Sequence, residues 1–253
     1  MNAVAAEWIK LRSLRSTWWS LGAGVLTALA LTVLGAYAVI SRWDPGQAGE
    51  QAAMGIVVAV YVGVVLAQLP LGMLGAMSIT GEHASGMIDT TFVATPSRSR
   101  VLLAKACVLG GLAVAASLLI AIPGYLYGQA VAAEFHPTSP PAGAWAVVAG
   151  GTLMIVMTTL LGLALGALFR NGAVAISVLV VLLGLVPFAG QVLPGGDVAN
   201  RVLPGYPALQ LIEQVPDIMP DPAAFALLAA WTIIPLLLAI RANVGGRLYR
   251  PRS

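Results

Sequence analysis

The sequence carries very little charge. Only 9% of its 253 residues are Asp, Glu, Lys or Arg, whereas soluble domains carry about 25%. A single cysteine, Cys107, excludes a disulfide within the chain and a cysteine-based zinc cluster. The glycine-rich pattern that cradles nucleotide phosphates and ends in Gly-Lys-Ser/Thr is absent as well, so the chain has no P-loop of its own. The net charge of +3 gives no indication of nucleic-acid binding.

Long apolar runs take the place of the missing charge. The chain is 59% hydrophobic, its mean hydropathy is +0.90, and its apolar runs are continuous over roughly 20 residues, the length of a membrane-spanning helix. A transmembrane β-barrel would instead show short segments of alternating polarity. We therefore predict an all-α integral membrane protein in a single domain, with six spans at about residues 18–40, 52–79, 101–128, 144–169, 172–193 and 223–240.

The positive charges predict an orientation for these spans. With the N-terminus inside, only Arg42 and Arg201 of the thirteen basic residues stand outside. The others stand inside: Lys10, Arg12, Arg15, Arg98, Arg100, Lys105, Arg170, Arg241, Arg247, Arg250 and Arg252. Because Lys and Arg gather on the cytoplasmic side, both termini and residues 80–100 are predicted to be cytoplasmic and residues 194–222 external. The Arg-, Ala- and Gly-rich composition suggests a GC-rich bacterial genome, and hence a bacterial plasma membrane.

Residues 1–17 mix apolar and basic side chains. On a helix, Trp8 and Leu11 lie on one face, while Lys10, Arg12 and Arg15 reach toward water from its sides. This pattern predicts a short interfacial helix on the cytoplasmic surface of the membrane. The alternative is a disordered basic tail that only orients the first span.

Residues 80–100 form the most polar cytoplasmic segment. A segment this polar cannot lie in lipid, and we interpret it as the place where a soluble partner grips the membrane protein. The residues expected to make the contact are Glu82, His83, Ser85, Gly86, Met87, Ile88 and Asp89. The alternative is a solvated loop whose charges only enforce the topology.

Polar groups within the predicted spans are few. No span has Asp, Glu, Arg or His at mid-depth, although ion-driven transporters usually need such groups, and Lys105 lies near a helix end. Gln68 is expected to face other helices, either as a plain interhelical hydrogen-bonding group or along a substrate path. Gly162 and Gly166 permit close helix approach, within the chain or at a dimer face.

The 194–222 loop is rich in apolar residues and also carries four acids. It either dips back into the membrane as short re-entrant helices or packs as a compact loop on the helix ends.

The order of these features resembles the permease subunits of ABC-2-type ATP-binding-cassette transporters, in their short six-span bacterial form. Before the first span, the matching residues are Glu7-Trp8-Ile9-Lys10-Leu11-Arg12-Ser13 and Arg15-Ser16-Thr17-Trp18. Around the third span they are Thr80-Gly81-Glu82, Ser85-Gly86, Thr90-Thr91, Ala94-Thr95-Pro96, Arg98, Arg100 and Ala104-Lys105.

The resemblance implies an ABC-2 exporter fold with an N-terminal connecting helix and a cytoplasmic coupling helix of which Glu82 to about Ile88 are part. It implies two permease copies, identical or different, and two separate ATPase subunits that hold ATP and magnesium. This chain would then be neither an enzyme nor the holder of a cofactor or a metal. The alternatives are a non-transporting membrane scaffold of the same fold and, less favoured by the residues, an intramembrane enzyme.

Overall fold

The structure is a computed structural model that describes residues 3–13, 15–40, 48–88, 91, 97–135, 144–185, 203 and 221–245. Its elements are all helices. In chain order they are α1 (Ala3–Ser13), α2 (Arg15–Ile40), α3 (Ala48–Ala84), α5 (Arg98–Phe135), α6 (Ala144–Phe169), α7 (Gly172–Val180), the π-helical turn η2 (Val181–Leu185) and α11 (Asp221–Gly245).

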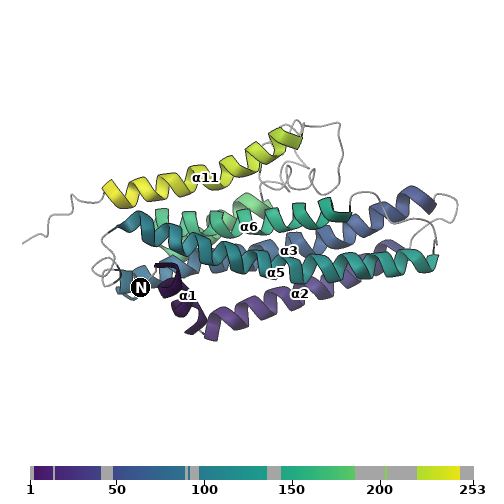
Figure 1. Cartoon of the computed structure of the whole chain (residues 1–253), viewed down its shortest axis with the longest axis horizontal. Coiled ribbons are helices and arrows are strands. Elements are labelled where there is room, and N and C mark those ends of the chain that lie inside the picture. The colour runs from purple at the N-terminus through teal and green to yellow at the C-terminus, as the bar shows by residue number, and fades with distance from the viewer. Residues whose placement is uncertain are drawn as a thin grey trace, which may run out of the picture.

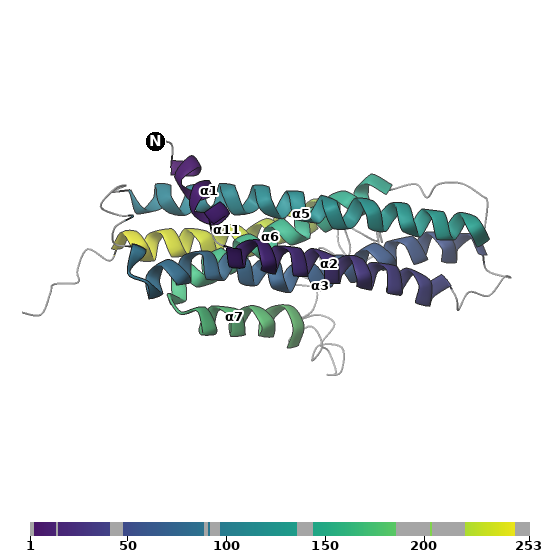
Figure 2. The same ribbon diagram turned by 90° about the horizontal axis from the view of Figure 1, so that it is seen from below.

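The long helices lie roughly side by side in one elongated bundle (Figure 1). The short helix α1 is tilted away from the long direction of that bundle, and α7 lies along one side of it, against α3 and α6 (Figure 2). In both views, α1 and the C-terminal end of α11 lie at the same end of the molecule. We call it the α1 end of the bundle.

Within the described part of the chain, five helices are long and apolar enough to cross a membrane. Their apolar stretches are Thr17–Gly35, Gly63–Ala84, Arg98–Ala130, Val148–Phe169 and Ala223–Ala242. The described part of the predicted fifth span is the shorter apolar stretch Gly172–Leu185. Residues 186–193, which would complete that span, lie outside the described residues, as do almost all of residues 194–222. Six spans therefore remain a prediction, as does the re-entrant loop.

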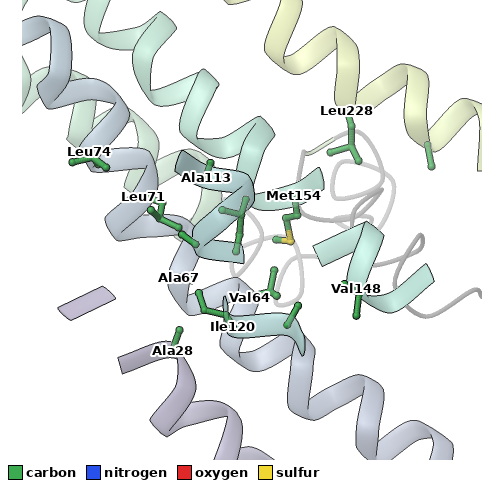
Figure 3. Close-up of a cluster of buried hydrophobic side chains, with 14 residues drawn as sticks. Ala28, Val64, Ala67, Leu71, Leu74, Ala113, Ile120, Val148, Met154 and Leu228 are labelled. Carbon is green, nitrogen blue, oxygen red and sulfur yellow. The ribbon is translucent and has the colours of Figure 1, made fainter. Parts of the chain in front are cut away.

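The main core lies where four of the long helices and α11 meet (Figure 3). Ala28 of α2 and Ile120 of α5 are buried there with Leu71 of α3, Met154 of α6 and Leu228 of α11. Most of α2 and α11 remains exposed, which suits helices that face lipid rather than water.

Glycines let α3 and α6 approach closely. A Cβ on Gly162 would collide with the carbonyl oxygen of Gly72, and a Cβ on Gly166 would come within 2.7 Å of the carbonyl oxygen of Ala76. Of the two uses considered for the Gly162–Gly166 spacing, the structure shows packing within the chain.

Candidate functional site

Four charged side chains meet at the α1 end of the bundle and form what we call the charge cluster. Lys105 Nζ of α5 donates to Glu7 Oε2 of α1 at 2.6 Å and to Glu82 Oε1 of α3 at 3.0 Å. Lys10 Nζ of α1 donates to Glu7 Oε1 at 2.8 Å and to Glu82 Oε1 at 3.1 Å. Each ammonium group thus contacts both carboxylates, and the cluster has no net charge.

The cluster is largely removed from solvent. Lys105 is 2% exposed, Glu7 3% and Glu82 8%, while Lys10 is only partly buried. Burial alone would raise the pKa of Glu7, but the ammonium groups of Lys105 and Lys10 outweigh it and hold that pKa below its usual value. Burial alone would lower the pKa of Lys10, but Glu7 and Glu82 outweigh it and raise that pKa.

Removing one member of such a cluster is costly. A buried ion pair adds little net stability, but breaking one by truncating a single partner typically costs about 3–5 kcal/mol, because the other charge stays buried. The oxygen Oε2 of Glu82 is already buried and has no hydrogen-bond partner among the described residues. The loss of a lysine would leave further carboxylate oxygens in that condition.

Apolar packing holds α1 against the bundle beside the charge cluster. Leu11 is 5% exposed and belongs to a second buried group with Leu109 of α5 and Leu163 of α6. The other side of α1 is open, and Trp8, Ile9 and Arg12 are exposed there. Trp8 and Leu11 were expected to share one apolar face, but Leu11 faces the protein, whereas Trp8 is exposed. That α1 lies on the membrane surface stays a prediction.

The predicted partner-binding segment begins inside α3. Glu82 and His83 lie in the last turn of α3, and the chain turns at Ser85 and Gly86. Gly86 has a φ of +71°, a left-handed conformation that commonly ends helices and that glycine adopts at little cost. Met87 and Ile88 beyond the turn are helical again. The single helix expected over residues 82–88 is therefore divided by a turn.

This division gives the predicted contact residues different environments. Glu82 and Ile88 are buried, and His83 is partly buried, with its Nδ1 atom 2.9 Å from the carbonyl oxygen of Ile79. Ser85, Gly86 and Met87 are exposed at the tip of the turn, and Asp89 lies outside the described residues. Among these residues, the exposed surface open to a partner is therefore the turn itself.

Gln68 lies deep in the bundle, at the contact of α3 and α6. It is 4% exposed, and its Oε1 atom accepts a hydrogen bond from Thr158 Oγ1 at 3.4 Å. This contact agrees with the interhelical role expected for a lone amide in lipid. A small hollow of about 10 Å³ lies nearby between α6 and α11, lined by Met157, Thr158 and Trp231 among others. That volume holds about one water molecule.

Basic groups gather at the same end as the charge cluster. Gly172, which opens α7, lies against Thr80 near the end of α3, so the turn between α6 and α7 belongs to this end. Several described basic residues lie in α1 or near those helix ends that are at the α1 end of the bundle. They are Lys10, Arg12, Arg15, Arg98, Arg100, Lys105, Arg170 and Arg241. All of them are on the side predicted to be cytoplasmic.

Sequence reasoning assigned no site role to two members of the charge cluster. Glu7 entered only as part of a family motif, and Lys105 entered as part of that motif and as a basic residue near a helix end. A signal was present: Lys105 is the eighth residue of the apolar stretch Arg98–Ala130, and a charge within such a stretch requires a partner. The only acid before Asp44 is Glu7, which makes it a natural candidate.

The comparison with known protein families agrees with this architecture. The family of ABC-2 family transporter proteins matches residues 3–187. The chain belongs to the ABC-2 transporter family. No curated protein matches it. The chain is therefore a multi-pass membrane component of a transporter, of a family that works with ABC ATPase partners and is not itself catalytic.

Proposed function

We propose that the chain is the permease subunit of an ATP-driven exporter in a bacterial plasma membrane, with both termini in the cytoplasm. Two permease copies, identical or different, form the translocation path, and two separate ABC ATPases hold ATP and magnesium. This chain holds neither cofactor nor metal. ATP binding closes the ATPases, and the motion reaches the permease through residues 80–100.

The observation that carries the proposal is the exposed turn at Ser85–Met87. The turn stands on the rigid end of α3, between a buried carboxylate at Glu82 and a buried apolar side chain at Ile88. Met87 is 48% exposed beside it. An exposed thioether on a fixed base can fill a pocket on a soluble partner, since methionine adapts its shape to irregular apolar surfaces.

We place the cargo path between two permease chains. The hollow between α6 and α11 is far smaller than the pockets of about 300–1,000 Å³ that hold drug-sized ligands. The lipid-facing helices carry apolar side chains, and the buried groups near mid-bundle are neutral ones such as Gln68 and Thr158. Such walls suit an amphipathic or lipid-like cargo, a drug or a peptide better than a highly charged one.

Changing one exposed side chain on the turn tests the docking. Met87→Asp places a negative charge where the ATPase is proposed to bind, without touching the buried cluster. Asn171→Asp is the matched control, because it adds the same charge in another exposed turn at this end. Aspartate can also keep the helix cap that Asn171 gives α7, where Oδ1 accepts from the backbone amide of Val174 at 3.3 Å.

The measurement is co-purification of the chain with ABC ATPases from the same genome, tested one by one, together with ATP-dependent transport by the reconstituted complex. Single anchors at an interface cost more than about 1–2 kcal/mol when lost, so Met87→Asp should weaken ATPase binding at least tenfold. Asn171→Asp should bind like the parent. Equal binding by both variants would show that residues 85–87 are not the docking surface. A parent chain that binds no ATPase would overturn the proposed function itself.

A further inference from the structure

We infer that Lys105 is a positioning residue that, through Glu7 and Glu82, joins α1, the end of α3 and the proposed docking turn into one unit on α5. The inference rests on the proposed function for its purpose, because it assigns the cluster to the segment that receives the ATPase. The contacts of Lys105 with Glu7 and Glu82 do not depend on the proposed function, and their effect can be tested without an ATPase.

Three separate parts of the chain meet at the Lys105 ammonium group. Glu7 is 98 positions away in the sequence and Glu82 is 23 positions away, yet both accept hydrogen bonds from the same nitrogen. Because Lys105 is 2% exposed, its charge cannot turn to water for compensation. The two carboxylates must stay beside the ammonium group, and this requirement holds α1 and the end of α3 against α5.

Lys10 extends the same contacts past the turn. Besides its two carboxylate partners, its Nζ atom donates to Thr91 Oγ1 at 3.1 Å. The Thr91 hydroxyl in turn donates to the carbonyl oxygen of Met87 at 3.0 Å. The exposed turn at Ser85–Gly86 is therefore held on both sides, by Glu82 before it and by Thr91 after it, and both holds involve Lys10.

The charges and the apolar contact of Leu11 have separable effects on α1. Leu11 belongs to a buried apolar group with residues of α5 and α6, and its burial does not depend on any charge nearby. The charge cluster adds a second requirement, because its two ammonium groups and two carboxylates must be equal in number to leave no buried net charge. Removing Lys105 alone leaves one ammonium for two buried carboxylates, which favours separation of α1 and the turn from α5. Removing Glu7 as well restores the balance and removes the reason to separate.

Spin-label distances in the full chain test this inference. In a Cys107→Ser background, one label pair replaces Arg12 and Leu103 and reports α1 against α5. A second pair replaces Met87 and Leu103 and reports the turn against α5. A control pair at Leu119 and Ile233 lies on exposed positions of α5 and α11 and reports the bundle. Each is measured in phosphatidylcholine nanodiscs by pulsed electron spin resonance.

The expected pattern depends on charge balance. In Lys105→Met, both reporting pairs should lose their narrow distance distribution and shift to longer distances, while the control pair stays narrow. In Lys105→Met with Glu7→Gln, the α1 pair should become narrow again. A packing role alone would leave the double variant as broad as the single one, and that result would overturn the inference. So would parent-like distances in Lys105→Met.

A milder variant covers the case in which Lys105→Met does not fold, which a broadened control pair would reveal. Lys10→Met removes a partly exposed side chain and with it the bond to Thr91. The turn pair should broaden while the control pair stays narrow, and an unchanged turn pair would overturn the inference. All these measurements use the chain by itself. A parent chain that binds no ATPase would therefore overturn the proposed function without affecting the positioning role inferred for Lys105.

Discussion

The Lys105 ammonium nitrogen lies 2.6 Å from Glu7 Oε2, which ties an N-terminal helix to a membrane-spanning helix 98 positions further along the chain. The contact explains why α1 lies across the end of the bundle and why a lysine can be buried at 2% exposure. The same ammonium reaches Glu82, next to the turn proposed to receive the ATPase. The attachment of α1 and the placement of the turn thus depend on the same charge.

The attachment of α1 should depend on pH in a defined direction. The pKa of Glu7 is lowered by Lys105 and Lys10 despite burial, so its contribution is present above the ordinary carboxyl value of 4.5 and is lost as the pH falls through the lower native pKa. The pKa of Lys10 is raised, so its contribution is present below 10.5 and is lost as the pH rises through the higher native pKa.

The Arg12–Leu103 label pair can follow this response. The distance should stay constant through neutral pH and lengthen only on acidification below about 4.5 or at strongly alkaline pH. In Glu7→Gln, the distance should already be longer at neutral pH, as in the acid form of the parent, because two ammonium groups then face a single carboxylate. Separation of α1 that begins near neutral pH in the parent would contradict this assignment.

Leu11 and Ile9 should differ sharply although they are two residues apart on α1. Leu11 is 5% exposed and belongs to a buried apolar group, whereas Ile9 is 58% exposed. Leu→Ala at a packed site costs about 2–5 kcal/mol, so Leu11→Ala should weaken the docking of α1. Ile9→Ala should change it little, because surface substitutions usually stay within about 0.5 kcal/mol.

Trypsin cleavage at Arg12 and Arg15 in detergent measures this difference, since proteolysis of a helix that opens transiently follows its opening equilibrium. Faster cleavage is expected in Leu11→Ala and parent-like cleavage in Ile9→Ala. Equal rates in the two variants would mean that α1 is not held by its buried face.

The close contact of α3 and α6 should not tolerate a methyl group. A Cβ on Gly162 would collide with the carbonyl oxygen of Gly72, and that backbone can move only with the helix. Overpacking of this kind costs about 1–3 kcal/mol, so Gly162→Ala should lower the thermal unfolding midpoint in detergent. Gly111→Ala in α5 is the control, since nothing lies within 4 Å of its Cβ position. A midpoint lowered equally by both would contradict the packing argument.

Sequence patterns predicted an all-helical chain and most of its long helices, while the partner-binding role of residues 80–100 stays a prediction. Runs of apolar residues mark a spanning helix directly, so α6 begins and ends where it was predicted. The basic N-terminal segment and the polar segment around Glu82 were identified because charge is expensive near lipid. Both predictions depend on local composition, which a single sequence displays.

The contacts within the site were beyond that reasoning. Nothing in the spacing of Glu7, Glu82 and Lys105 states that they meet, because their contact depends on how α1, α3 and α5 pack. The break at Gly86 was not predicted, because the left-handed φ of +71° at this glycine depends on where α3 stops. Sequence alone therefore located the segment but did not separate its buried carboxylate from its exposed turn.

The side of the membrane that holds the α1 end is the last prediction. Arg12, Arg98 and Arg170 all belong to this end, and an excess of Lys and Arg marks the cytoplasmic side. In a Cys107→Ser background, single cysteines at Ser85 and Ala133 report the two ends of the bundle, because Ser85 is exposed beside the α3 turn and residue 133 lies near the other end of α5. An impermeant thiol reagent added to intact cells should label position 133 and spare position 85. Permeabilised cells provide the control, since both positions should react there. Labelling of position 85 from outside would place the docking turn away from cytoplasmic ATP, and the exporter assignment would then fail along with the topology.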